Sequence, residues 1–332
     1  MGELAPADAG VVPETPGGVN DAVPWYVRER PVLAALVDGA GAAGLDRDAV
    51  TILLDSRMVS AAVNTARDAL SYALTALAAA RRLGDPILEA EAEREVGGKY
   101  AQLHELDLAD RHLGRALDLF LSLGDATGEA HTLRTLGYAA ILREQADRAI
   151  DLYLQSVQAA RRASTAVLAA ALADLGWAFA RFGRYRDAIE PTEDALRIAR
   201  EDGIPYLEPI VLPTLAVARA KTGSAEQAVG LFEEALSLLR AHGNRSGELD
   251  VLADDGDALS ELGDPGGARR VWTGYLRLVE VTDTQESVSD LAVSGRTRQA
   301  EVTSGPVLST ALRTTVRSRR STSPKSTGCI AP

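Results

Sequence analysis

Residues 129–160 read EAHTLRTLGYAAILREQADRAIDLYLQSVQAA, and the spacing of their apolar residues predicts two helices. In the first half, Leu133, Leu136 and Ala140 fall at the three- and four-residue intervals that place side chains on one helix face. A break at Gln145 separates this half from DRAIDLYLQSVQAARR, which has an apolar stripe of its own. Because both halves are amphipathic, we expect them to form a helical hairpin.

The same hairpin recurs along the chain with a period of about 40 residues, marked by four columns of equivalent positions. The small-residue column is Gly97, Gly137, Gly176, Ala216 and Gly256, and the alanine column is Ala69, Ala109, Ala149, Ala188, Ala228 and Ala268. The apolar column is Leu77, Leu117, Val157, Leu196, Leu236 and Leu276, and the turn column is Gly84, Gly124, Ser164, Gly203 and Gly243. One hairpin cannot bury its own apolar stripes, so the repeats must stack. We therefore expect an all-α, right-handed helical-repeat solenoid of about twelve helices, without β-sheet.

The repeat resembles the tetratricopeptide repeat (TPR), whose signature runs Leu-Gly, then Ala, then an aromatic residue. Leu136, Gly137, Ala149 and Tyr153 match that signature in order. The period departs from the family's, at about 40 residues against about 34. We therefore expect longer helices where one unit passes to the next. The small residues are expected to let paired helices approach closely.

Three stretches look like the C-terminal part of large actinobacterial regulators of antibiotic synthesis, the SARP class. They are WYVRERPVLAALVDGAGAAGL at 25–45, LGDATGEA at 123–130 and DALSELGDPGGARRVW at 257–272. The resemblance covers about residues 24–280 and implies the regulatory or sensing portion of a transcription regulator. Members of that class carry a DNA-binding domain and an ATPase ahead of such repeats, and nothing here matches those parts.

Composition and periodicity divide the chain into four parts. Residues 1–23 form an acidic linker with prolines and glycines, and 24–64 form helices that lead into the repeats. Residues 65–281 hold the TPR-like repeats. Residues 282–332 are rich in Ser, Thr and Arg and lose the period, so we expect a disordered tail.

Gly39, Gly41 and Gly44 spell G-x-G-x-x-G, the fingerprint of a dinucleotide site. That site needs a helix that crosses back to a parallel strand, which takes about a dozen residues. Only six residues, 45–50, separate Gly44 from Thr51. We therefore expect no cofactor and interpret the glycines as the end of a helix.

We expect no enzyme activity, because no nucleophile has a nearby base partner and no group of residues has metal-ligand spacing. The four histidines are His104, His112, His131 and His242. The single cysteine, Cys329, excludes an internal disulfide and fits a reducing cytoplasm. No apolar run is long enough for a membrane helix, so no membrane partner is expected.

Charge is unevenly spread over the chain, whose net charge is −12. Residues 24–280 carry 28 bases and 39 acids, so 28 − 39 = −11, which disfavours direct nucleic-acid binding by the repeats. Residues 281–332 carry seven bases and four acids, with a basic cluster from Arg313 to Lys325. The alternative function is therefore nucleic-acid binding through the tail, which deletion of residues 303–332 would abolish.

The partner is expected in a concave groove formed by the first helices of the repeats. The expected stripe lies three residues before, one after and five after the small-residue column. Its members are Arg94, Gly98, Gln102, Arg134, Tyr138, Leu142, Ala173, Trp177, Arg181, Pro213, Val217, Lys221, Ala253, Asp257 and Glu261. The residues expected to bind a protein or peptide are Arg94, Gln102, Arg134, Tyr138, Trp177, Arg181, Val217 and Lys221.

Arginine and aromatic residues favour an acidic or aromatic-containing partner segment. The alternative, that Tyr138 and Trp177 only pack between neighbouring helices, stays open, and so does self-association.

Prolines predict two irregularities. Pro205, Pro209 and Pro213 predict a first helix that starts late, near Pro209, where the first turn tolerates proline. Pro191 is expected to kink or split its helix unless it falls in a first turn.

Overall fold

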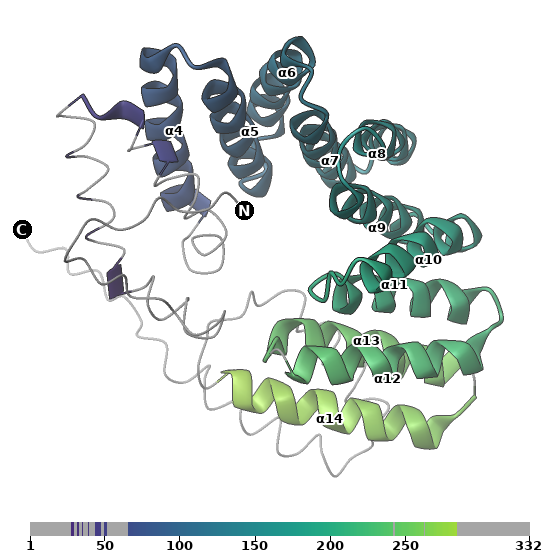
Figure 1. Cartoon of the computed structure of the whole chain (residues 1–332). Helices are drawn as coiled ribbons and strands as arrows, with labels where there is room; N and C mark the ends of the chain where they lie inside the picture. Colours follow the sequence, from purple (N-terminus) through teal and green to yellow (C-terminus); the bar gives the residue numbers. More distant parts are fainter. Residues whose placement is uncertain are drawn as a thin grey trace, which may run out of the picture. The chain divides into compact units, whose positions relative to one another are not determined.

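The computed structural model describes residues 66–283, apart from 242 and 262, together with individual residues between 28 and 51. This described part contains eleven α-helices in tandem and no strand (Figure 1). The helices are α4 (Ala66–Leu83), α5 (Pro86–Gln102), α6 (Leu106–Leu123), α7 (Ala126–Leu142), α8 (Ala146–Ala160), α9 (Thr165–Arg181), α10 (Tyr185–Glu201), α11 (Glu208–Lys221), α12 (Ala225–Ala241), α13 (Arg245–Glu261) and α14 (Pro265–Asp283). The all-α, TPR-like helical-repeat fold is therefore confirmed.

The chain forms two compact units, Met1–Ala178 and Phe179–Pro332. Within each unit, helices in extensive contact are neighbours or next-but-one neighbours in sequence. In the first unit α5 contacts α6 and α7, and in the second unit α11 contacts α12 and α13. Each helix therefore depends on its nearest neighbours, as expected for a repeat protein.

The small-residue column faces a large side chain of the following helix. A Cβ atom at Gly97 would lie 2.6 Å from Leu113 Cγ, and one at Gly256 would lie 2.6 Å from Trp272 Cε2. Leu113 and Trp272 are both buried, and each lies 16 residues after its glycine. Real Cβ atoms do not come this close to carbon, so these positions need glycine for the two helices to pack.

The turn column joins the second helix of one unit to the first helix of the next. Gly124 adopts the left-handed conformation, with φ of +68°, and ends α6. The side chain of Asp125 then accepts hydrogen bonds from the N–H groups of Thr127 (2.9 Å) and Gly128 (3.0 Å). Asp85 caps α5 in the same way. The Gly-Asp pair thus ends one helix and starts the next.

The prolines give one confirmed prediction, and a second prediction for which only the splitting of the helix is tested. Helix α11 begins at Glu208, five residues after the turn glycine Gly203, with Pro209 in its first turn as predicted. Pro191 was expected to kink or split its helix, but α10 is not split and holds Pro191 as its seventh residue. Pro191 is buried, and packing of its ring offsets the lost backbone hydrogen bond.

Of the three glycines in the fingerprint, the structure describes Gly39 and Gly44, whereas Gly41 lies outside the described residues. Gly39 is helical, and Gly44 makes a turn with φ of +75°. Val50 and Thr51, which a nucleotide site would need in a strand, are helical. Val50 is fully buried and packs with Leu77 of α4. Val50 therefore belongs to the hydrophobic core that includes α4.

Some expectations lie outside the described residues. They concern the linker 1–23, the exact bounds of the helices in 24–64, and the tail beyond Asp283, including the basic cluster from Arg313 to Lys325. Within the described part, α14 ends at Asp283, two residues beyond the expected end of the repeats. None of the described helices is long and apolar enough to cross a membrane.

Candidate functional site

On the first helix of each unit, the residue that follows the small-residue column lies on the surface. These residues are Gly98, Tyr138, Trp177, Val217 and Asp257, and none of the five is buried. Because Gly137 and its equivalents face the paired second helix, the next residue turns away from it. This position gives each unit one surface residue on its first helix.

Three residues before the small column, two of the five expected stripe residues are not on the surface, whereas Arg94, Arg134 and Pro213 at the same position are half-buried. The two are Ala173 and Ala253, which are buried, with exposures of 6% and 1%. The residue that follows each of them, Asp174 or Asp254, is half-buried instead. In these two units, the residue one position later lies nearer the surface than the expected one.

In the first unit, two aromatic side chains occupy this surface one repeat apart. Tyr138 on α7 is 39% exposed and Trp177 on α9 is 38% exposed. Buried packing between helices would cover such side chains much further, as it covers Tyr153, which is 2% exposed. Tyr138 and Trp177 thus offer apolar area that no described residue of their unit covers fully.

An ion pair joins the same two helices. The Nε atom of Arg134 on α7 donates to Oδ2 of Asp174 on α9 at 2.5 Å. A second guanidinium nitrogen of Arg134 lies 3.2 Å from Nδ1 of His131. Arg134 is therefore held in place on the surface, and its charge is balanced by a carboxylate of the next repeat.

Behind this surface lies the phenol of Tyr153 on α8. A Cβ atom at Gly137 would lie 2.9 Å from the Tyr153 ring, so α7 and α8 touch directly there. Burial raises the pKa of Tyr153, and the charge of Asp174 raises it further. Tyr153 is thus a buried, neutral side chain near Arg134 and Asp174.

The remaining expected residues of the first unit lie at its margins. Arg94 on α5 is half-buried, and its Nη1 atom lies 3.3 Å from Oε1 of Glu95. Gln102 is exposed at the last position of α5. Between α5 and α7, a Cβ atom at Gly98 would lie 3.7 Å from Cγ2 of Thr135, so these first helices are in contact. Arg134, Tyr138 and Trp177 are the expected residues on α7 and α9 of the first unit.

The other three expected residues belong to the second unit. Arg181 is exposed in the last turn of α9, and Val217 is half-buried on α11. Lys221, at the end of α11, donates a hydrogen bond to Glu261 of α13. That hydrogen bond raises the pKa of the Lys221 ammonium group.

Sequence reasoning did not predict the ion pairs of these cations, although it placed Glu261 in the expected stripe. Asp174 lies 40 residues after Arg134, and Glu261 lies 40 residues after Lys221. The separation equals one repeat period, because equivalent residues on successive first helices lie side by side. An acid one period after a surface base is therefore a signal that the sequence already contained.

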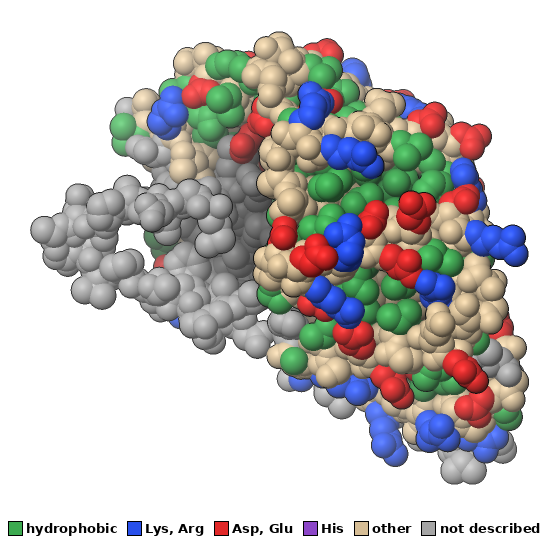
Figure 2. Space-filling model, turned by 45° about the vertical axis from the view of Figure 1, so that its right-hand side comes forward, with side chains coloured by type: hydrophobic (Ala, Val, Ile, Leu, Met, Phe, Trp, Pro, Cys, Tyr) green, Lys and Arg blue, Asp and Glu red, His purple; other side chains and the backbone are tan. Residues whose placement is uncertain are grey.

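Two features of the described surface concern metal and nucleic-acid binding. No group of three or more His, Cys, Asp or Glu among them could hold a metal ion. Figure 2 shows one face on which acidic and basic side chains are mixed with apolar ones rather than separated by sign. A mixed face of this kind does not present the continuous positive surface that nucleic-acid backbones require.

Comparison with known proteins supports the repeat type. The tetratricopeptide-repeat family matches residues 128–201, which span α7 to α10. This match places a TPR region at the centre of the described helices. No curated protein sequence matches the chain.

Several solved structures share the fold. A signal transduction ATPase with numerous domains (STAND) from Pyrococcus horikoshii, which has a tetratricopeptide repeat sensor, is 16% identical with a TM-score of 0.62. The match covers 91% of this chain and 48% of that one, so this chain spans about half the length of that protein.

Two further structures belong to Rap proteins. The apo form of RapI is 16% identical with a TM-score of 0.54, over 82% of this chain and 97% of that chain. A Rap protein complexed with competence and sporulation factor is 14% identical with a TM-score of 0.51, over 71% and 76%. At these identities the likeness concerns the fold.

Proposed function

We propose that this chain is a non-enzymatic TPR scaffold that binds a protein or peptide through the exposed surface of α7 and α9. The observation that carries the proposal is the pair of partly exposed aromatic side chains, Tyr138 and Trp177, on the two helices that the Arg134–Asp174 ion pair joins. Trp, Tyr and Arg are the residues that most often dominate binding energy at protein interfaces.

The chemistry of this surface suits a segment with both apolar and polar groups. Tyr138 and Trp177 supply apolar area on adjacent first helices. Arg134 retains further N–H donors, and Asp174 retains acceptor capacity, for the polar groups of a partner. Because the two charges balance each other, this surface selects by shape and aromatic contact more than by net charge. An aromatic-containing segment therefore fits better than a purely acidic one.

The wider role that we propose is the regulatory or sensing portion of a SARP-type transcription regulator. Support comes from the SARP-like stretches in the sequence and from the kind of proteins that share the fold. One of them is described as having a TPR sensor, and another is complexed with competence and sporulation factor. The missing DNA-binding and ATPase functions would then belong to other parts of the regulator.

The test uses three forms of the full chain as bait in native cell extract. They are the wild type, a Tyr138→Ala, Trp177→Ala double variant, and Tyr206→Ala. Tyr206 is a matched control because it is an aromatic residue with 62% exposure that lies outside the proposed surface. Proteins retained by the wild type are identified by mass spectrometry, and the affinity of the purified partner is then measured by calorimetry.

We expect the double variant to bind its partner at least about 30-fold more weakly, because interface aromatics often contribute 2 kcal/mol or more. The Tyr206→Ala variant should bind as the wild type does, and thermal melting should be similar for all three. Equal binding by the double variant would rule out this surface. If the captured partners include no regulatory protein, the SARP assignment is contradicted. The scaffold assignment is unaffected by that result.

A further inference from the structure

The surface of the first unit has a notch at Gly98 on α5. Gly98 occupies the position that Tyr138 and Trp177 occupy on α7 and α9, but it has no side chain. Among the described residues, a Cβ atom at Gly98 would meet only Cγ2 of Thr135 on α7, at 3.7 Å. No atom of Tyr138 lies within 4 Å of that Cβ position, so the surface beside Thr135 is open there.

Packing of the described helices does not require glycine at this position. Five other glycines of the first helices would each place a Cβ atom within 3.0 Å of a neighbouring side chain, namely Gly97, Gly128, Gly137, Gly247 and Gly256. At Gly98 the distance of 3.7 Å is an ordinary van der Waals contact, so an alanine would fit. Glycine inside a helix is less favourable than alanine. Gly98 therefore weakens α5 without a packing contact that explains it.

Two polar residues bound the notch along α5. Arg94 and Gln102 lie four residues before and four residues after Gly98, so they share its helix face. Arg94 is paired with Glu95, with 3.3 Å between Nη1 and Oε1, and its charge is thereby balanced. Gln102 is exposed, and no residue of the described part forms a hydrogen bond with its side-chain amide. The notch therefore suits an uncharged side chain, while Gln102 can bond to the main chain beside it.

Tyr138 decides which uncharged side chain fits best. It is 39% exposed and lies three residues after Thr135, on the same face of α7. We propose that the notch receives an aromatic side chain of the partner segment, which lies on the bare backbone at Gly98 and against the Tyr138 ring. Two aromatic rings stabilise each other beyond the area that they bury, whereas an aliphatic side chain gains from burial alone. The inference rests on the proposed function, because the notch continues the surface of α7 and α9.

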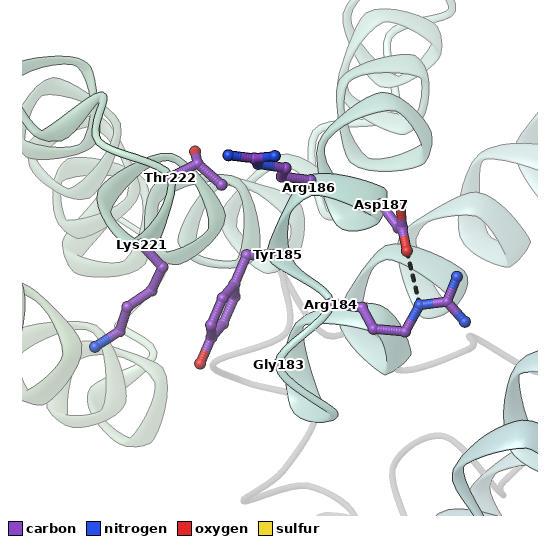
Figure 3. A pocket seen from close by; sticks show the side chains of 7 residues that line it. All are labelled: Gly183, Arg184, Tyr185, Arg186, Asp187, Lys221 and Thr222. Carbon is purple, nitrogen blue, oxygen red and sulfur yellow. Dashed lines mark hydrogen bonds and ion pairs between the residues drawn. The ribbon is translucent and has the colours of Figure 1, made fainter.

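The second unit has side chains at the positions equivalent to Gly98. These positions are Val217 on α11 and Asp257 on α13. A pocket of about 450 Å³ in that unit lies elsewhere, between the turn that joins α9 to α10 and the end of α11 (Figure 3). In that pocket Arg184 Nε donates to Asp187 Oδ2 at 2.7 Å, so the two charges balance each other. We therefore assign the aromatic contact to the first unit.

The test selects peptides from a random twelve-residue library displayed on phage, with the full wild-type chain as the immobilised target. An enriched peptide is synthesised with a fluorescein label, together with versions in which its aromatic residues are replaced by leucine one at a time. Fluorescence anisotropy then measures binding to the wild type, Gly98→Leu, Gly114→Leu, and the Tyr138→Ala, Trp177→Ala double variant. Gly114 is a matched control, because it lies inside α6 of the same unit and a Cβ atom there would meet nothing within 4 Å.

The enriched peptides should contain Trp, Tyr or Phe. Gly98→Leu should weaken their binding by at least about tenfold, because the leucine fills the notch, while Gly114→Leu should change it by less than about twofold. In the wild type, replacing the aromatic residue that occupies the notch should weaken binding about three- to tenfold. In Gly98→Leu the same replacement should have less than about a twofold effect, because the contact is already lost.

The fold itself should tolerate a side chain at this position. Gly98→Ala should raise the melting temperature by roughly 1–3 °C, because alanine favours a helix. A lower melting temperature would show that packing requires Gly98, and it would overturn the inference.

Equal binding by the wild type and Gly98→Leu, or equal weakening by both leucine variants, would also overturn the inference. Additive effects of Gly98→Leu and the aromatic replacement would place the aromatic residue elsewhere and overturn it. So would a wild-type chain that enriches no aromatic-containing peptide. If the Tyr138→Ala, Trp177→Ala variant loses binding while Gly98→Leu retains it, the notch is ruled out and the proposed function stands.

Discussion

At the scale of single residues, glycine decides how closely the paired helices approach. Gly256 meets the buried Trp272, whereas a Cβ atom at Gly274 in the interior of α14 would meet nothing within 4 Å. The two positions make opposite predictions for the same substitution. Gly256→Ala should destabilise the fold by about 1–3 kcal/mol because the indole must move. Gly274→Ala should stabilise it by about 0.5–1 kcal/mol because alanine favours a helix. Urea unfolding of both variants measures these changes, and a loss of stability in both would contradict the argument.

A second residue-scale feature is the buried carboxyl of Asp255 on α13. Its side chain is 4% exposed, and its Oδ1 atom has no hydrogen-bond partner among the described residues. Burial, together with the smaller effect of the nearby charge of Glu233 on α12, raises the pKa of Asp255 from 3.8 to about 6. The protonated carboxyl therefore fits the fold better than the carboxylate does.

The stability linked to Asp255 should be fully present below about pH 4 and lost as pH rises through about 6. The difference of about two pH units corresponds to at most on the order of 3 kcal/mol. Asp255→Asn should therefore be more stable than the wild type at pH 7.5 and close to it at pH 4. Comparing urea unfolding of the two proteins at both pH values removes the titration of all other groups. A difference that does not change with pH would contradict the assignment.

At the scale of elements, the turns between repeats set where helices begin. Asp125 accepts hydrogen bonds from two N–H groups of α7, whereas Glu105, the residue before α6, makes no such bond. Asp125→Ala should therefore cost about 1 kcal/mol of stability. Glu105→Ala is the matched control and should change stability by less than about 0.5 kcal/mol. Thermal unfolding followed by circular dichroism gives both values, and similar losses would argue against capping.

The same elements show how far sequence reasoning reaches. Leu-Gly, alanine and turn columns predicted the hairpins because the 3.6-residue helical period and the glycine contact are local properties. That α10 continues through Pro191 without splitting could not be predicted, because the burial of Pro191 depends on tertiary packing. The Arg134–Asp174 pair was missed because it requires the lateral alignment of two first helices.

At the scale of the whole molecule, stability should be local, because contacting helices are close neighbours in sequence and the chain forms two compact units. Because each repeat is stabilised mainly by its nearest neighbours, strain in one hairpin should destabilise the adjacent helices and leave distant repeats unchanged. Gly137→Ala strains the contact of α7 with α8, and Gly256→Ala strains that of α13 with α14.

Native-state hydrogen exchange of the two variants tests this idea reciprocally. In Gly137→Ala, amide protection should fall in α5 to α8 and stay at the wild-type level in α13 and α14. In Gly256→Ala the pattern should reverse, because each substitution lies in a different unit. Local openings expose only the repeats that share the strained interface, whereas one cooperative unit would lose protection everywhere at once. A uniform loss of protection in both variants would therefore show that the two units unfold together.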